Sequence, residues 1–91
     1  MNHFDQGLIH LKSGNAIDAE KCFAEAILQE PNNANAWFHK GKANRLKGDM
    51  IAALNDFYKT LDIESNHAEA NVSIELIKNI LSFRNPDLMN H

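Results

Sequence analysis

The residues of this chain whose side chains most often perform chemistry are Cys22, His3, His10, His39, His67 and His91. The histidines lack the clustered spacing of a metal site. His3 and His10 would lie about 10.5 Å apart along a helix, too far to bind one ion together. Cys22 could act as a nucleophile only beside a poised histidine, and its place next to Phe23 favours a core or boundary role. We therefore expect no metal, no cofactor, no catalytic residue and no enzymatic activity.

Three further features could carry chemistry, and each is better explained without it. Gly41 and Gly48 lie seven residues apart and form no glycine-rich phosphate loop. Asn71-Val72-Ser73 matches an N-glycosylation acceptor, but it falls inside a predicted helix of a chain with no export signal. Trp37 is accounted for by packing in the core. We expect no role for it in stacking on nucleic-acid bases.

Composition and charge narrow the class of protein. The 91 residues are enough for one small domain. Lys and Arg number 9 against 12 Asp and Glu, and the net charge of −3 opposes binding to nucleic acid. One cysteine cannot form an internal disulfide, which favours a reducing compartment. No signal peptide and no apolar run of roughly 18–20 residues is present. We therefore expect a cytoplasmic protein that does not enter membranes.

The chain contains an internal repeat with a period of 34 residues. Shifting the sequence by this period superposes identical residues at ten positions, many of them glycines or core-type residues. The superposed pairs are Phe4/Phe38, Gly7/Gly41, Gly14/Gly48, Ile17/Ile51, Ala19/Ala53, Phe23/Phe57, Glu30/Glu64, Asn32/Asn66, Ala34/Ala68 and Ala36/Ala70. A repeat of this length indicates a stack of similar structural units.

Each unit is predicted to contain two helices. Gly14 and Gly48 suit the ends of helices that need a positive φ, and Asn15, Asp49 and Asn66 are the predicted N-caps of the helices that follow. Apolar residues recur with the helical period, and no β-strand is predicted. The expected helices cover residues 2–12, 16–29, 35–46, 50–63 and 68–83. The predicted organisation is a single domain over 1–83, with repeats over about 1–33 and 34–67, a last helix over 68–83 and a tail over 84–91.

The pattern resembles the tetratricopeptide repeat. The residues that carry the resemblance are Gly7, Ala19, Phe23, Ala26 and Pro31 in the first unit and Trp37, Gly41, Ala53 and Phe57 in the second. It covers about residues 1–67, and the fifth helix resembles the terminal capping helix of the family. The resemblance implies an all-α fold, an α-α superhelix of two helix-turn-helix repeats plus a capping helix.

Close packing explains the shared residues. We expect Gly7 and Gly41 to approach Ala19 and Ala53, while the two phenylalanines fill the space between units. The chain departs from the family pattern at several positions. Unit one has His3 in place of a large aromatic residue, and His10 and Asn44 stand where a tyrosine is usual. Thr60 replaces an alanine and Ser65 a proline. We expect these departures to weaken the packing.

The resemblance also implies a binding function. Folds of this family bind peptides or other proteins in a concave groove lined by the first helix of each unit. The predicted groove residues are Phe4, Leu8, Leu11, Phe38, His39, Lys42, Arg45, Val72, Leu76 and Asn79. One subset of the family clamps a C-terminal carboxylate with Lys, Asn and Arg side chains. The equivalent positions here hold none of these donors, so we do not expect that activity.

Four cations lie close together in the second unit, at Lys40, Lys42, Arg45 and Lys47, with no acid between them. This cluster favours a partner segment that is acidic or apolar. The alternative is a solvated helix face whose cations are stabilised near the helix C-terminus.

The fifth helix carries two apolar stripes. The first contains Ala70, Ile74, Ile77 and Leu81, and the second contains Val72, Leu76, Ile80 and Phe83. One stripe is expected to cover the last repeat. A capping helix normally has a polar outer face, so the second stripe suggests an alternative function, in which the chain is a structural protein that forms a homodimer through this helix.

Overall fold

The computed structural model describes residues 1–84, and these residues form five α-helices without a β-strand. The helices are α1 (His3–Lys12), α2 (Ala16–Gln29), α3 (Ala34–Lys47), α4 (Met50–Ile63) and α5 (Ala68–Arg84). The predicted all-α fold is confirmed. Arg84, placed in the tail by the sequence pattern, is the last residue of α5. The rest of the predicted tail lies outside the described residues.

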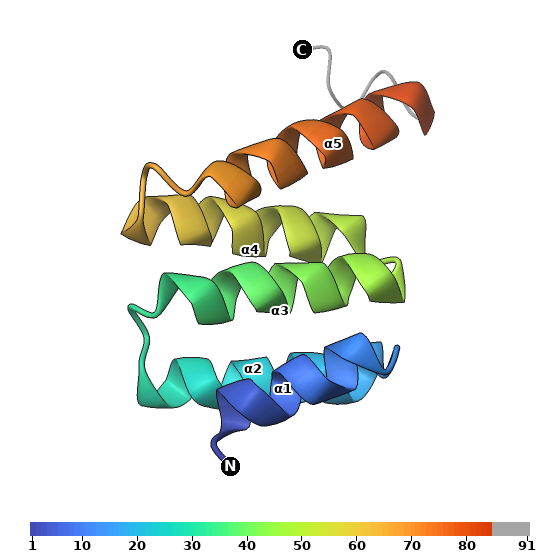
Figure 1. Cartoon of the computed structure of the whole chain (residues 1–91). Coiled ribbons are helices and arrows are strands. Elements are labelled where there is room, and N and C mark those ends of the chain that lie inside the picture. Colours follow the sequence, from blue (N-terminus) through green and yellow to red (C-terminus); the bar gives the residue numbers. More distant parts are fainter. Residues whose placement is uncertain (85–91) are drawn as a thin grey trace.

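The helices stack in chain order (Figure 1). α1 packs against α2, α3 lies between α2 and α4, and α5 covers the free side of α4. α1 also touches α3, which brings the first helices of the two units into contact. This stacking gives each helix a neighbour for its apolar face, as a repeat architecture requires.

Side-chain oxygens cap the starts of three helices. Asn2 accepts the backbone N–H of Asp5 at 2.8 Å, and Asp49 accepts that of Ala52 at 3.1 Å. Asn33 accepts the N–H of the third residue along the chain at 3.3 Å, so α3 begins at Ala34, one residue before the predicted start. These bonds satisfy backbone donors that have no partner within the helix.

One predicted N-cap is confirmed in its position, and another is corrected. Asn15 occupies the N-cap position of α2 but makes no side-chain bond to the helix. The cap of α5 is His67 rather than Asn66, since the Nδ1 of His67 accepts the N–H of Ala70 at 3.1 Å. The His67 ring lies 4.8 Å from the ring of Phe38, and this packing holds its nitrogen over the helix end.

The turns inside the two units have the same geometry. Gly14 and Gly48 have φ values of 81° and 89°, a conformation that favours glycine because it has no Cβ. After each glycine a backbone N–H returns to the preceding helix, from Asn15 to His10 O at 2.8 Å and from Asp49 to Asn44 O at 2.9 Å. The predicted helix ends at these glycines are confirmed.

A phenyl ring against a glycine holds the two helices of each unit together. A Cβ on Gly7 would lie 2.6 Å from the ring of Phe23, and one on Gly41 would lie 2.6 Å from the ring of Phe57. The atoms nearest to these glycines therefore belong to the phenylalanines, and the approach to Ala19 and Ala53 stays a prediction. Both rings are fully buried.

The core consists of two clusters. The lower cluster joins Ala19, Phe23 and Ala43, with Phe4, Leu8 and Leu11 packed against it. The upper cluster joins Phe38, Ala53, Phe57, Ala70, Ile74 and Ile77, with Met50, Leu54, Leu61 and Leu81 packed against it. The upper cluster confirms that the first apolar stripe of α5 covers the last repeat.

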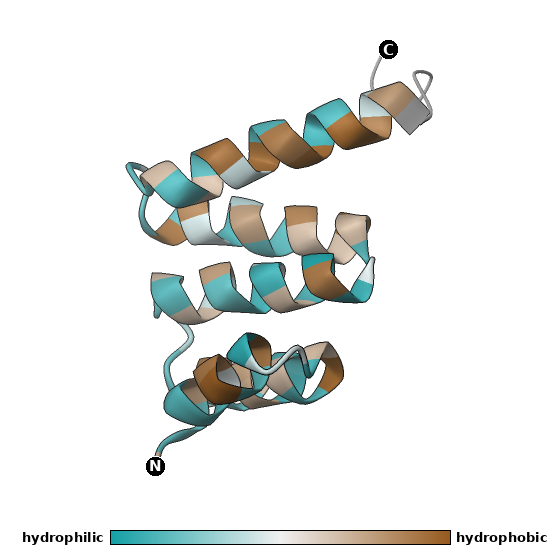
Figure 2. Ribbon diagram, turned by 45° about the vertical axis from the view of Figure 1, so that its right-hand side comes forward, coloured by the Kyte–Doolittle hydropathy of each residue, from teal (hydrophilic) through white to brown (hydrophobic). Residues whose placement is uncertain are grey.

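Figure 2 shows hydrophobic bands along α5 as well as the more hydrophilic surface of α3. Within residues 3–84, no helix has both the length and the apolar character needed to cross a bilayer.

The glycine contact predicts the effect of Gly41→Ala. The added methyl would overlap the Phe57 ring, and overpacking of this kind costs about 1–3 kcal/mol. Because the Phe57 ring is fully buried and has no free space to move into, we take the upper part of this range, about 2–3 kcal/mol. Alanine favours a helix over glycine by about 1 kcal/mol, so we expect a net loss of about 1–2 kcal/mol in the free energy of unfolding. Urea denaturation followed by circular dichroism measures it.

Asn55→Ala is the control for this prediction, because Asn55 is exposed on α4. We expect the free energy of unfolding of this variant to stay within about 0.5 kcal/mol of the wild type or to rise slightly. A Gly41→Ala variant as stable as the wild type would contradict the importance of the close approach.

Candidate functional site

Two hollows lie side by side on the face formed by the first helix of each unit and α5. The first has a volume of about 320 Å³ and is lined by Phe38, Lys42, Arg45, Ala68, Glu69, Val72 and Ser73. The second has a volume of about 330 Å³ and is lined by Leu11, Lys42, Arg45 and Leu46. Lys42 and Arg45 line both hollows, so the two cations form a ridge between an α3–α5 depression and an α1–α3 depression.

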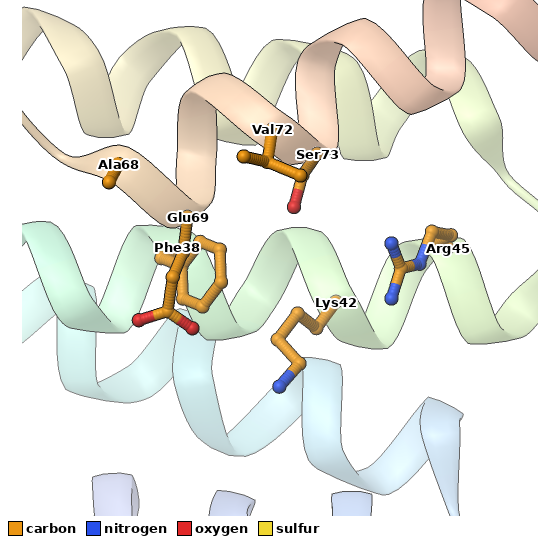
Figure 3. A pocket seen from close by; sticks show the side chains of 7 residues that line it. All are labelled: Phe38, Lys42, Arg45, Ala68, Glu69, Val72 and Ser73. Atoms are coloured by element: carbon orange, nitrogen blue, oxygen red, sulfur yellow. The ribbon is translucent and has the colours of Figure 1, made fainter.

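Figure 3 shows how the first hollow is built. Lys42 and Arg45 come from successive turns of α3, while Val72 and Ser73 come from α5 and lie across from them. Phe38 forms the floor near the start of α3, with only 4% of its surface exposed. The hollow therefore combines an apolar wall with two cations.

The two cations of the ridge are available to a ligand. Among residues 1–84 the ion pairs are Lys40–Asp56 and Lys78–Glu75, so neither Lys42 nor Arg45 is neutralised by a carboxylate of the described chain. The Nζ of Lys42 lies 5.6 Å from the centre of the Phe38 ring, within the range of a cation–π contact. Their charges therefore face the hollows without an ion-pair partner.

The four cations of α3 do not form one patch. Lys40 points toward α4, where its Nζ lies 2.9 Å from Oδ1 of Asp56, and Lys47 is exposed outside both hollows. Lys40 and Lys59 also lie 5.5 and 5.8 Å from the ring of Trp37. Of the four cations that lie close together in the sequence, Lys42 and Arg45 line the hollows, and Lys40 and Lys47 do not.

The partner of Lys40 belongs to a polar network that the sequence reasoning missed. Asn44 Nδ2 donates to Asp56 Oδ2 at 2.6 Å, and Thr60 Oγ1 donates to the main-chain oxygen of Asp56 at 2.9 Å. Asn44 and Thr60 were expected to weaken packing, but both are buried and hydrogen-bonded. The sequence did contain an indication of this network. Asp56 falls on the buried stripe of α4 between Ala53 and Thr60, and a buried carboxylate needs hydrogen-bond or ion-pair partners.

Burial and the polar partners of Asp56 shift the pKa of its carboxyl group in opposite directions. Burial raises the pKa of Asp56 above its ordinary value, while the hydrogen bond and charge of Lys40 and the hydrogen bond from Asn44 act to lower it. A buried carboxylate in this position is stable only with such partners. The network therefore fixes how α3 and α4 sit against each other.

His39 is part of an aromatic cluster beneath the groove. Its ring centre lies 5.4 Å from that of Phe4, 5.8 Å from that of Phe23 and 5.2 Å from that of Phe38. Its Nδ1 donates to the carbonyl oxygen of Asn35 at 2.8 Å. Burial lowers the pKa of His39, and the hydrogen bond to Asn35 opposes this shift. The ring thus ties α1, α2 and α3 together.

The remaining predicted groove residues lie at the two ends of this surface. Phe4 and Leu8 of α1 pack on the lower core cluster and are partly buried. On α5, Leu76 is 47% exposed and Asn79 is exposed. Neither α5 side chain lines the two hollows, whereas Val72, 68% exposed, lines the first.

The second apolar stripe of α5 is exposed along much of its length. Phe83 is 90% exposed, and Ile80 is partly buried. The helix face with Asn71, Glu75 and Lys78 is mostly polar, with an ion pair of 3.8 Å between the last two. Shifted by 34 residues, Val72 corresponds to Phe38 and Leu76 to Lys42. The exposed stripe therefore begins on the groove side of α5.

Comparisons with known proteins support the resemblance read from the repeat. Human tetratricopeptide repeat protein 36 is 29% identical over 65 residues, which are 71% of this chain and 34% of that protein. A homolog of it from Nematostella vectensis is also 29% identical over 65 residues, 71% of this chain and 36% of that protein. FK506-binding protein 59 from Drosophila melanogaster is 31% identical over 70 residues, 76% of this chain and 16% of that protein.

No family model matches the chain. The chain spans 36% or less of the length of the three relatives described above. The similarity to proteins named for the tetratricopeptide repeat, together with the stacked helix pairs, confirms the resemblance to that family.

The polar network predicts the cost of Asp56→Ala. Removing the carboxylate leaves the Asn44 amide buried without its partner and frees Lys40 from its ion pair. An unsatisfied buried group costs about 1–3 kcal/mol, and we expect a loss of that size in the free energy of unfolding, measured by urea denaturation. Asp62→Ala is the matched control on the exposed side of α4, and an equal loss in both variants would contradict the role of the network.

The lowered pKa of His39 predicts how stability depends on pH. As pH falls below the ordinary value of 6.5, the unfolded chain takes up a proton that the folded chain does not yet bind. His39 therefore contributes a loss of stability as pH falls from about 7 through the folded pKa, with a slope of at most about 1.4 kcal/mol per pH unit. Urea denaturation between pH 7.5 and 5.5 measures it. The profile of His39→Gln is expected to be flatter, and identical slopes would contradict the prediction.

Proposed function

We propose that this protein is an interaction module that binds a segment of another protein on the surface formed by α1, α3 and α5. The observation that carries the proposal is the pair of hollows that share Lys42 and Arg45. Similarity to proteins named for the tetratricopeptide repeat supports a role in protein–protein interaction. The proposal needs no chemistry from the chain beyond non-covalent binding.

The lining of the hollows supports a bound segment that combines apolar and acidic side chains. Phe38 and Val72 offer an apolar wall in one hollow, and Leu11 and Leu46 offer one in the other. The ridge of Lys42 and Arg45 between them complements carboxylates. Apolar contact supplies most of the affinity of such a segment, while the charges select and orient it.

The size of the site limits its strength. Two shallow hollows of about 320 and 330 Å³ accept a few side chains each. Ordering a flexible segment opposes binding. We therefore expect affinity of about micromolar for a short peptide.

The groove-lining residues proposed from the sequence divide into two roles. Phe38, Lys42, Arg45 and Val72 are proposed to touch the ligand in the first hollow, and Leu11 in the second. Phe4, Leu8 and His39 are proposed to act mainly by supporting the floor of the groove, since they pack on buried aromatic residues. Leu76 and Asn79 are proposed to extend the surface for longer segments.

Self-association through α5 is a second candidate function. It is favoured by the exposure of Val72, Leu76 and Phe83, which are 68%, 47% and 90% exposed. A homodimer that pairs these stripes would remove apolar surface from water. Sedimentation equilibrium at about 100 µM is the test, since this is well above the dissociation constant of a stable dimer. A dimer that dissociates in Leu76→Glu would support this candidate, and a monomeric wild type would exclude it.

The proposed binding site predicts the outcome of selection from a random peptide display library. We expect the wild-type chain to enrich sequences that contain apolar and acidic residues together. Reversal of both ridge charges, in Lys42→Glu/Arg45→Glu, is expected to abolish that enrichment, because attraction becomes repulsion at both hollows.

Lys47→Glu is the control for the selection, since it reverses one positive charge on an exposed turn of α3 outside the hollows. The control variant is expected to enrich the same sequences as the wild type. Equal enrichment by the wild type and the double variant would overturn the proposed site.

A further inference from the structure

The first hollow has opposite charges at its two ends. Glu69 of α5 lines the end that also contains Phe38 and Ala68, while Arg45 of α3 lines the other end. Figure 3 shows the Glu69 carboxylate beside the Phe38 ring and the Arg45 guanidinium beyond Ser73. A ligand that complements both ends of the hollow therefore carries a positive charge as well as a negative one.

The separation of these charges follows from the helix that supports them. Phe38 and Arg45 are seven residues apart on α3, which corresponds to about 10.5 Å along the helix. Lys42 lies between them in the sequence, but its Nζ lies 5.6 Å from the centre of the Phe38 ring. Arg45 is therefore the cation at the end of the hollow opposite Glu69. A chain in the polyproline II conformation rises about 3.1 Å per residue and brings every third side chain back to the same side, so the two ends of the hollow correspond to positions three residues apart in such a ligand.

Neither end of the hollow is neutralised from within the described chain. Glu69 forms no ion pair among residues 1–84, and the same holds for Lys42 and Arg45. Glu69 and Val72 are both exposed to solvent. A ligand carboxylate placed at the Glu69 end would meet a like charge, while one placed at the Arg45 end would meet an opposite charge.

We propose that this hollow selects a dipolar segment rather than a uniformly acidic one. The segment places a Lys or Arg side chain at Glu69, an apolar side chain against Phe38 and Val72, and a carboxylate at Arg45. This inference rests on the proposed function and narrows its ligand. Glu69 acts here as a specificity-determining residue that disfavours polyacidic partners.

Four end-blocked peptides test this inference, each flanked by glycines and differing only in charge. Their central sequences are Lys-Leu-Leu-Glu, Glu-Leu-Leu-Glu, Lys-Leu-Leu-Lys and Gln-Leu-Leu-Gln. Titration into the ¹⁵N-labelled chain, followed by NMR, measures the affinity and locates the site. We expect Lys-Leu-Leu-Glu to bind about fivefold more tightly than Glu-Leu-Leu-Glu or Lys-Leu-Leu-Lys, because one favourable charge pair replaces one repulsive pair.

Charge reversal at Glu69 supplies the matched variants. Glu69→Lys is expected to shift the preference to Glu-Leu-Leu-Glu by about fivefold, because both ends of the hollow are then basic. Glu75→Lys makes the same change on the same helix but outside the hollow. That control is expected to keep the preference for Lys-Leu-Leu-Glu.

The outcomes separate this inference from the proposed function. If Glu-Leu-Leu-Glu binds the wild type in this hollow as tightly as Lys-Leu-Leu-Glu, the inference is overturned and the binding site stands. The inference is also overturned if Glu69→Lys leaves the preference unchanged. If none of the four peptides shifts the resonances of Phe38, Lys42, Arg45 or Val72, both the inference and the proposed site are overturned.

Discussion

The contact between a glycine and a phenyl ring inside each unit is the constraint on which the rest of the structure depends. Because Gly7 and Gly41 have no side chain, the rings of Phe23 and Phe57 occupy the space where a Cβ would lie. This brings the two helices of each unit close together and leaves the first helices to form one face. The residue 34 positions after Gly41 is Glu75, which is exposed. A further helix packed against α5 as α4 packs against α3 would place a side chain on the Glu75 carboxylate. This side of α5 is therefore compatible with exposure to solvent.

A second constraint is specific to the second unit. Asp56 is held by Lys40 and Asn44, and it links α3 to α4 from the side opposite the groove residues. Since Lys40 is engaged there, Lys42 and Arg45 are left as the cations of the ridge. The polar network therefore divides the cations of α3 between a structural face and the proposed binding face.

The repeated features of the fold could be predicted from the sequence, and the unrepeated ones could not. The turns at Gly14 and Gly48 recur in both units, and their positions were correct. The network was missed because its positions differ between the units. Lys40, Asn44, Asp56 and Thr60 correspond to Gln6, His10, Cys22 and Ala26. A comparison of the two units identifies packing contacts that both units share. A buried polar contact between residues that occur in one unit only depends on side-chain geometry, which the sequence comparison does not provide. The cap formed by His67 was missed for the same reason, since it needs the Phe38 ring beside it.

The most direct test of the proposed groove is an NMR measurement of contacts between the chain and a bound leucine-containing peptide with acidic residues. The first hollow predicts nuclear Overhauser effects from the leucine methyl groups of the peptide to the Phe38 ring and to the methyl groups of Val72, both of which line it. Contacts confined to the polar side of α5 around Asn71, or to the exposed side of α4, would contradict binding in the groove.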